Sequence, residues 1–474
     1  MKISILLSAA AAVLAFAMPA QSRELTDHEQ MARDIYEQVI SFRTARGHGQ
    51  VPAMVDYLVG ELKAAGFSDD DIQITDYDSD GEPTQGLMVT YHGKSGSTKK
   101  PIVLLAHMDV VDALPEDWER APFTLTQEDG YFFGRGTIDN KYGVTNLTAT
   151  FIRLKKEGWV PNRDLVLVFS GDEETGMIST RAQAVYVAEN IDPEFVLNSD
   201  AGGGSLAADG NHLFFAVQGA EKTYATWELT VENQGGHSSR PRDDNAIYEL
   251  ADALKNIEAH KFPVRSTELT RAFFKASGAV TPGPLGEAMQ KFAQNPKNKK
   301  AIEVLRANPE TVGTTGTTCV ATMLRGGHAE NALPQSATAT VNCRIFPGVS
   351  AAATQETLKE VVENDNIHFN LLTDVTESPE SKLRPDVLAA IEKALVARGV
   401  NAPVIPYMES GGTDGMHYRT KGYDTVAISG AAIKPTNMFA HGLNERLSVD
   451  AFYAGLDHWS IILKELASDE DAGD

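Results

Sequence analysis

The stretch Leu165–Gly176 reads LVLVFSGDEETG and indicates the fold class of the chain around it. It begins with a continuous run of apolar residues that stops at a Ser-Gly pair. A run of this kind, bounded by turn residues, predicts a strand buried on both faces, as in a parallel sheet. Three carboxylates at positions 172–174 follow the strand, where open α/β sheets place their chemistry. Such acids repel one another unless a cation lies among them, so the loop is either a solvated acidic turn or part of a cation site.

Length and charge limit the possible classes of protein. The chain has 474 residues, of which 42% are hydrophobic, and a formal net charge of −23. This length predicts a large core and two domains rather than one. The acidic balance argues against binding to nucleic acid or to an anionic membrane surface.

The first 20 residues have the pattern of a secretory signal. Lys2 precedes an apolar run, and small residues near Ala17 and Ala20 offer cleavage sites. The run is too short and badly flanked for a stable membrane anchor. We therefore expect an exported protein, periplasmic or secreted, without a membrane anchor.

The two cysteines, Cys319 and Cys343, flank the connection Gly326–Pro334 almost symmetrically. Paired strands on either side of this connection would bring them face to face. Export permits a disulfide between them, and two buried thiols are the alternative.

Helix-like and strand-like segments alternate over residues 24–209 and again over 346–467, which predicts one α/β domain in two parts. Between them, at 210–345, the pattern predicts an inserted α+β domain. The alternation of Tyr224–Val231, with Ala225, Trp227, Leu229 and Val231 on one face, is typical of a half-exposed antiparallel strand.

Two further features of this part of the chain complete the predicted organisation. The segments Thr317–Leu324 and Ala337–Ile345 resemble a strand pair, and Glu268–Asn308 is mostly helical in pattern. The acidic tail at 468–474 is expected to be disordered.

Several histidines and acids fall at predicted strand ends, and a mixed set of imidazoles and carboxylates suits zinc, with cobalt or manganese as substitutes. Five ligands can hold two ions only if one is shared, and among these side chains only a carboxylate can bridge. Two such ions about 3.5–4 Å apart polarise a carbonyl and generate hydroxide near neutral pH. Each residue taken alone is more often structural. The candidates are His107, Asp109, Asp139, Glu173, Glu174, Asp200 and His441.

Within this set, Glu173 and Asp109 have predicted roles other than metal binding. Glu173 stands beside a candidate ligand and is placed to take a proton from water. Asp109, two residues after His107, can accept the other N–H of that imidazole and orient it.

In order along nearly the whole mature chain, six segments resemble motifs of the co-catalytic zinc exopeptidases. That family includes glutamate carboxypeptidase, aminoacylase, carnosinase and carboxypeptidase S. The loop Asp112–Pro122 with Trp118, and Gly134–Thr137, look most like its carboxypeptidase S and N-acyl-amino-acid hydrolase branch. The six segments are Leu105–Val111, Gly134–Lys141, Ser170–Gly176, Asn198–Gly202, Gly235–Ser239 and His441–Glu445.

The resemblance implies a role for each candidate. It places one zinc on His107 and Asp200 and the other on Glu174 and His441, with Asp139 as the bridge. It also makes Glu173 the general base and Asp109 the orienting residue, and it implies a cis peptide bond between Asp139 and Asn140. The family usually has a second aspartate where this chain has Asn140, which leaves the tuning of the metals and their preference open.

The implied fold is a mixed, mostly parallel sheet flanked by helices, interrupted by a lid or dimerisation domain. In that lid, His237 matches a histidine that helps to stabilise the oxyanion, and Asn331 and Arg344 match residues that hold the substrate carboxylate. An arginine binds a carboxylate bidentately. Lid domains of the family pair, and we expect the edge of Tyr224–Val231 to form a homodimer in which His237 reaches the partner's metals.

These features predict an exported zinc hydrolase that cleaves an amide next to a free carboxylate in a peptide or N-acyl amino acid. The alternative is a catalytically silent metal- or peptide-binding protein on the same scaffold, against which the intact Glu173 argues. A serine hydrolase fits less well, because no Gly-x-Ser-x-Gly elbow precedes a helix.

Overall fold

The computed structural model describes residues 24–469. The predicted signal segment 1–20 and residues 470–474 of the predicted acidic tail lie outside the described residues. Within residues 24–469, no helix is long and apolar enough to span a bilayer.

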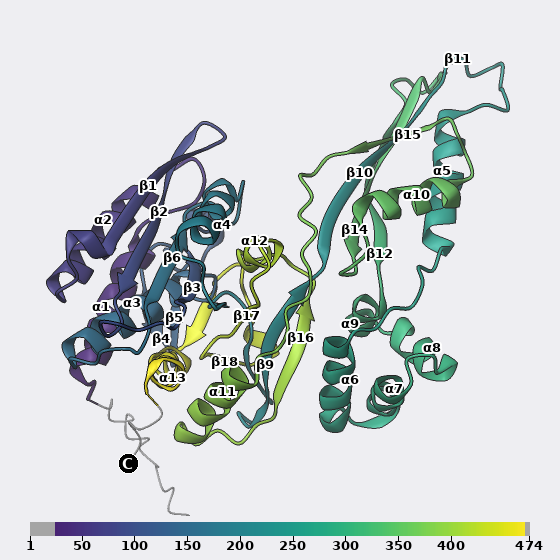
Figure 1. Ribbon diagram of the computed structural model, residues 1–474. Helices are drawn as coiled ribbons and strands as arrows, with labels where there is room; N and C mark the ends of the chain where they lie inside the picture. Colours follow the sequence, from purple (N-terminus) through teal and green to yellow (C-terminus); the bar gives the residue numbers. More distant parts are fainter. Residues whose placement is uncertain (1–23, 470–474) are drawn as a thin grey trace, which may run out of the picture.

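The larger domain is organised around a ten-stranded mixed sheet formed by the described residues (Figure 1). The order is β1-β2-β6-β3-β7-β17-β9-β8-β18, and β16 pairs with β9. The central strands β6, β3, β7 and β17 run parallel to one another, whereas β1 and β2 form an antiparallel margin. The strands are β1 (Ile72–Ser79), β2 (Glu82–Tyr91), β3 (Ile102–His107), β6 (Leu165–Ser170), β7 (Phe195–Asn198), β8 (Gly203–Leu206), β9 (His212–Glu221), β16 (Val404–Glu409), β17 (Thr425–Ala427) and β18 (Ala432–Ile433).

Helices cover both faces of this sheet, as the apolar run in β6 predicts. All six residues of β6 are buried. Leu165, Leu167 and Phe169 pack in the main core with α1, α2, α3, α11 and α13, and Val166 and Val168 pack with α4 and α12. The helices are α1 (Asp27–Ser41), α2 (Val51–Ala64), α3 (Lys141–Lys156), α4 (Ile178–Asn190), α11 (Pro385–Ala397), α12 (Gly415–Thr420) and α13 (Val449–Ala467).

A small antiparallel sheet, in the order β19-β5-β4, closes the side of the larger domain. It brings the chain just before α13 beside the loop that leads to the bridging candidate Asp139. Its strands are β4 (Thr126–Glu128), β5 (Tyr131–Phe133) and β19 (Arg446–Ser448).

The smaller domain has a sheet in the order β12-β14-β10-β15, covered on one face by α5 and α10 (Figure 1). In β10 the four predicted inward residues are fully buried, which confirms the alternation read from the sequence. A two-stranded ribbon of β11 and β13 extends from its outer end. The elements are β10 (Thr223–Glu232), β11 (Gly236–His237), α5 (Ala246–Ala259), β12 (Thr318–Gly326), β13 (Ala332–Leu333), β14 (Ser336–Ile345), α10 (Ala351–Val362) and β15 (Ile367–Leu371).

Two details differ from the sequence-based expectation. The expected edge at Tyr224–Val231 is wrong: β10 is an inner strand, paired on one side with β14 and on the other with β15. The strands of the smaller sheet run from Thr223 to Leu371, whereas the predicted insertion covers 210–345. Periodicity reports which face of a strand is buried, but it carries no information on which strands become its neighbours.

The helical segment predicted at Glu268–Asn308 forms a compact unit beside the smaller sheet. Phe274, Met289, Phe292 and Leu305 build a core of their own there, and α6 also packs on β16 of the large sheet. The helices are α6 (Glu268–Val280), α7 (Gly283–Gln294), α8 (Lys299–Ala307) and the short α9 (Pro309–Val312).

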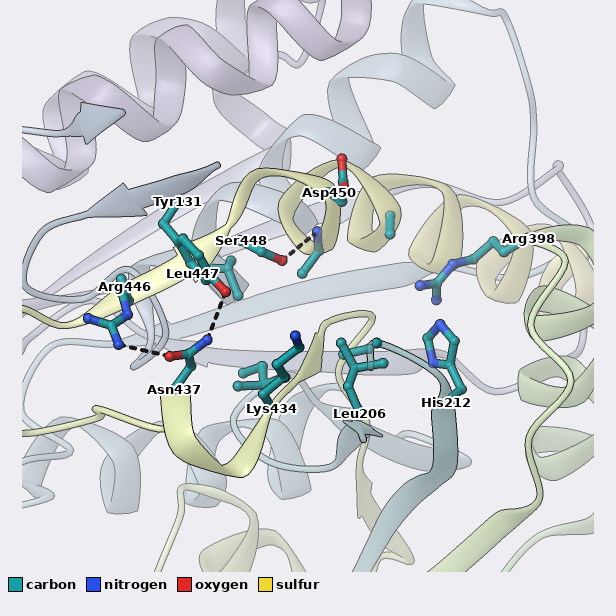
Figure 2. A pocket seen from close by; sticks show the side chains of 15 residues that line it. Tyr131, Leu206, His212, Arg398, Lys434, Asn437, Arg446, Leu447, Ser448 and Asp450 are labelled. Atoms are coloured by element: carbon teal, nitrogen blue, oxygen red, sulfur yellow. Dashed lines mark hydrogen bonds between the residues drawn. The ribbon is translucent and has the colours of Figure 1, made fainter. Parts of the chain in front are cut away.

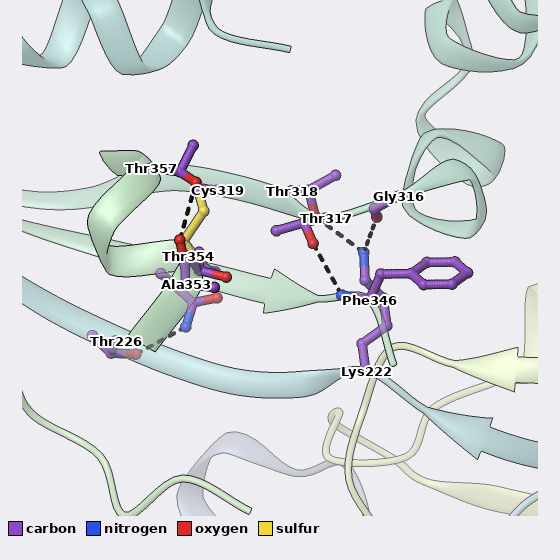
Figure 3. The surroundings of a disulfide bond; sticks show 12 residues. Lys222, Thr226, Gly316, Thr317, Thr318, Cys319, Phe346, Ala353, Thr354 and Thr357 are labelled. Atoms are coloured by element: carbon purple, nitrogen blue, oxygen red, sulfur yellow. Dashed lines mark hydrogen bonds between the residues drawn. A yellow bond between two sulfur atoms is a disulfide. The ribbon is translucent and has the colours of Figure 1, made fainter. Parts of the chain in front are cut away.

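Cys319 and Cys343 form a disulfide that joins β12 to β14 (Figure 3). The two residues lie directly opposite each other in the antiparallel register. Of the two alternatives predicted from the sequence, a disulfide or two buried thiols, the structure contains the disulfide.

Candidate active site

Parallel strands bring the predicted ligands together. β3 ends at His107, beside Ser170 at the end of β6. β3 also pairs with β7, whose end precedes Asp200. Because the carboxyl ends of parallel strands meet at one edge of the sheet, three segments far apart in sequence supply side chains to a single place.

Asp139 lies between the two predicted histidine ligands. Its Oδ1 is 2.9 Å from His107 Nε2, and its Oδ2 is 3.1 Å from His441 Nε2. Each carboxylate oxygen therefore faces a different imidazole, which is the arrangement that a bridging carboxylate requires. The peptide bond between Asp139 and Asn140 is cis, as the resemblance implies.

The other two predicted ligands lie one on each side of this bridge. Asp200 Oδ1 is 3.5 Å from His107 Nε2, and Glu174 Oε1 is 2.9 Å from His441 Nε2. The structure thus groups the five predicted ligands into a His107 side and a His441 side that share Asp139.

The Asp109 carboxylate holds the acidic loop as well as facing the imidazole. Its two oxygens accept hydrogen bonds of 3.0 Å from the backbone N–H groups of Glu173 and Glu174. The Nδ1 of His107 is 3.0 Å from the Asp109 carbonyl oxygen and 3.5 Å from its carboxylate. Asp109 therefore links the first histidine to the loop that carries the predicted base.

The three carboxylates after β6 have different surroundings. Asp172 accepts hydrogen bonds from the backbone N–H groups of Ile178 and Ser179 at the start of α4, where free N–H groups favour an acid. Glu173 is buried, and its burial raises its pKa well above the usual range, with Asp200 acting in the same direction. A carboxyl group with a raised pKa is suited to hold a proton during catalysis.

Metal ions fit this donor set. Single ligand atoms of His107, Asp139 and Glu174 lie within 4.8 Å of one another. Burial, followed by the charge of Asp139, raises the pKa of Asp200 to about 7. Crowded carboxylates with this behaviour are stabilised by a nearby cation, and two imidazoles with three carboxylates match zinc chemistry.

Four of the five predicted ligands, Asp139, Glu174, Asp200 and His441, line a cavity of about 520 Å³. Arg344, on β14, lines this cavity, and its Nη1 donates to the carbonyl of Ser410 at 2.6 Å. Tyr407 and Glu409 of β16 line it as well. Arg344 therefore brings one side chain of the smaller domain to a cavity that the larger domain otherwise lines.

His237 and Asn331 do not line this cavity. They lie together on the β11–β13 ribbon, where the N–H of Ser238 donates to the carbonyl of Asn331 at 3.1 Å. His237 is exposed, and Figure 1 places β11 at the outer end of the smaller domain, far from the ends of β3 and β6. Of the three predicted substrate-binding residues, the structure brings only Arg344 to the site of its own chain.

Two buried acids near the site are not among the functional residues predicted from the sequence. Asp414 accepts hydrogen bonds of 2.7 Å from the hydroxyls of Ser170 and Thr180, behind the end of β6. Glu445 pairs with Arg135 and accepts from the backbone N–H of Asp139. Glu445 lies in the motif that begins at His441, and that position is the one signal that could have pointed to it.

The sequence profile of peptidase family M20/M25/M40 matches residues 103–465, and the chain belongs to that family. It is a hydrolase of the metallopeptidase class. Among curated relatives, the N-fatty-acyl-amino acid synthase/hydrolase PM20D1 of Xenopus tropicalis is 28% identical over 368 residues, covering 74% of this chain and 69% of the relative. The probable carboxypeptidase S-like 2 of Dictyostelium discoideum is 27% identical over 378 residues, covering 77% and 71%.

Solved structures share the fold at low sequence identity. The M20 family metallo-carboxypeptidase Sso-CP2 of Sulfolobus solfataricus superposes with a TM-score of 0.68 at 21% identity, covering 93% of this chain and 99% of that one. Human carnosine dipeptidase 1 gives a TM-score of 0.64 at 15% identity, covering 93% and 98%. The mixed sheet with flanking helices is therefore the fold of this family.

Proposed function

We propose that this chain is an exported dinuclear zinc hydrolase that cleaves an amide bond next to a free carboxylate. The observation that carries the proposal is the position of Asp139, whose two oxygens face His107 and His441 at 2.9 and 3.1 Å. His107, Asp139 and Asp200 would hold one ion, and Asp139, Glu174 and His441 the other. Bound there, the ions would polarise the amide carbonyl and lower the pKa of water.

Glu173 is the proposed general base. It follows the strand end directly, is buried, and has its backbone held by Asp109. Its carboxylate takes the proton of the attacking water and passes it to the leaving nitrogen, a role whose loss costs roughly 10²–10⁴-fold in rate.

Arg344 supports a substrate with a free carboxylate. Its guanidinium lines the cavity of the predicted ligands and has no acidic partner in an ion pair among the described residues. A planar guanidinium binds a carboxylate through two parallel hydrogen bonds. The relatives named for N-acyl amino acids and for carboxypeptidase activity are consistent with this substrate class.

The disulfide supports export. Cys319 and Cys343 are bonded, and disulfides persist in oxidising compartments such as the periplasm and the extracellular space. The proposed signal segment at 1–20 would bring the protein there.

A homodimer through the smaller domain is the proposed active form. Its edge strand β12 is exposed over most of its length and carries Val320, Met323 and Leu324, which are 60%, 65% and 69% exposed. Exposed apolar strand edges pair with other strands unless they are covered. Two copies joined along β12 would offer the outlying ribbon, with His237 and Asn331, to the partner's cavity.

The test of the proposed function is substrate profiling with controlled metal content. We expect the zinc-loaded mature protein to hydrolyse members of a panel of dipeptides and N-acyl amino acids, followed by liquid chromatography–mass spectrometry. Chelation should abolish this turnover, and zinc should restore it. Matched amides that lack the free carboxylate should be poor substrates. A metal-loaded protein that cleaves no panel member would instead favour the silent binding protein.

A further inference from the structure

A second cavity adjoins the cavity of the predicted active site at β18 and β19, and Figure 2 shows the side chains that line it. Its volume is about 360 Å³, within the usual range for small-molecule sites. Ile433 and Leu447 line both this cavity and the cavity of the predicted metal ligands. The predicted metal ligands themselves do not line it.

Three cations from separate elements line this second cavity: Arg398 at the end of α11, Lys434 after β18 and Arg446 in β19. Figure 2 shows Lys434 between the other two. Asp450 is the one acid among the described lining residues, and it is exposed. In a chain with a net charge of −23, this local excess of positive charge is the reverse of the overall balance.

None of the three cations has an acidic partner in an ion pair among the described residues, and their hydrogen bonds go to neutral groups. Arg398 donates to the Gly430 carbonyl at 3.0 Å and lies 3.0 Å from His458 Nδ1. Lys434 donates to the Ala208 carbonyl at 3.0 Å.

Arg446 donates to Asn437 Oδ1 at 2.8 Å. Because a guanidinium has five N–H donors and an ammonium three, each of the three cations keeps donors for an anion.

The rest of the lining combines polar side chains, Tyr131, His212, Asn437 and Ser448, with an apolar floor. Leu206, Ile433, Leu447 and Ala451 contribute this floor, and Leu447 is almost completely buried. A cation with spare donors beside an apolar floor matches a ligand with one anionic end and a short hydrocarbon body. A fully polar anion such as phosphate would leave the apolar floor without a partner, and a neutral hydrocarbon would leave the cations without one.

We propose that this cavity is a binding site for a free aliphatic carboxylate of medium length, with its carboxylate paired with Lys434, which lies between Arg446 and Arg398, and its chain against Leu206 and Leu447. The proposal does not depend on the hydrolase activity, because the residues that carry it are separate from the predicted ligands and from Glu173.

The experiment is calorimetric titration of the mature, zinc-loaded protein with octanoate, compared with acetate and 1-octanol. We expect octanoate to bind and the other two to bind at least about tenfold more weakly, since each lacks half of the recognised chemistry. The double variant Lys434→Gln/Arg446→Gln should weaken octanoate binding by at least about tenfold, the scale of one lost charge-assisted hydrogen bond. Leu206→Trp, which fills the cavity, should abolish it.

Two controls separate this cavity from the metal centre. Lys99→Gln removes a positive charge from an exposed position elsewhere, and Arg344→Gln removes the cation of the other cavity; both should keep the wild-type affinity for octanoate. The proposal is overturned if octanoate does not bind. It is equally overturned if binding is lost with Arg344→Gln and survives in both the double variant and Leu206→Trp, because the ligand would then occupy the metal centre.

Discussion

Arg135 and Glu445 form a buried ion pair, with Arg135 Nη1 2.7 Å from Glu445 Oε2. The Glu445 carboxylate also accepts from the backbone N–H groups of Gly136, Ile138 and Asp139. Arg135 Nη2 donates to the carbonyl of His441 at 3.3 Å. This one pair therefore holds the loop of the proposed bridging ligand against the loop of the second histidine.

Replacing Glu445 with Gln should weaken both metal binding and the fold. The change leaves the Arg135 charge buried without its partner, and breaking a buried pair in this way costs about 3–5 kcal/mol in the free energy of unfolding. Loss of an outer partner of metal ligands typically lowers metal affinity about 10–100-fold. Urea denaturation and zinc competition titrations measure the two effects.

A matched control is Lys359→Gln, which breaks the exposed pair of Lys359 with Glu356 and should change stability by less than about 1 kcal/mol. If Glu445→Gln behaves like this control, the ion pair does not position the ligands.

Glu173→Gln should retain two zinc ions and lose turnover by roughly 10²–10⁴-fold or more, because the amide cannot accept the proton of water. Metal content by mass spectrometry and kcat on the best panel substrate test this directly. Near-normal turnover at full metal occupancy would rule out Glu173 as the base.

Mixing two inactive variants tests whether His237 serves the partner subunit. His237→Ala and Glu173→Ala are refolded together so that heterodimers form. If His237 acts across the interface, each heterodimer contains one complete site, and activity returns. Heterodimers that form and stay inactive would show that His237 closes onto its own chain.

A charge on the exposed edge strand should separate the proposed dimer. Leu324→Lys places an ammonium group on β12 where apolar side chains are exposed, and charged edge residues prevent strand pairing. Sedimentation of this variant should show a monomer, and its turnover should be lower than that of the wild type. Val396→Lys, at a 75% exposed position on α11, should remain dimeric and active. A dimeric Leu324→Lys protein would place the interface elsewhere.

Acid should destabilise the fold in part through His417. Burial, followed by the charge of Arg181, lowers the pKa of His417 to about 4. The unfolded chain takes up a proton at this imidazole below about pH 6.5 and the folded chain does not. The contribution of His417 to the free energy of unfolding is therefore fully present above pH 6.5. It falls as the pH drops towards 4, by about 2 kcal/mol between pH 6.5 and 5.

Urea denaturation of metal-free wild-type protein and of His417→Gln at these two pH values isolates this contribution. The variant should lose about 2 kcal/mol less on acidification than the wild type. Equal losses in the two proteins would mean that His417 titrates alike in the folded and unfolded chains.

Much of the local structure follows from the sequence. The apolar run of β6 is buried on both faces, and the four alternating residues of β10 are buried as predicted. The capping box at Thr26 starts α1. The sequence also predicts the candidate ligands, because acids and histidines that follow apolar strands fall at the carboxyl edge of a parallel sheet. These are local patterns, in which a residue's burial is set by its position along one element.

Tertiary structure alone decided which elements meet. Arg135 and Glu445 are far apart in the chain, and the ion pair exists because β5 and β19 are neighbours. β10 became an inner strand because β15, later in the chain, returned to its free side. The cavity of Arg398, Lys434 and Arg446 likewise gathers cations from three elements. Sequence determines the faces that must be buried, whereas the pairing of those faces depends on long-range packing that no single segment encodes.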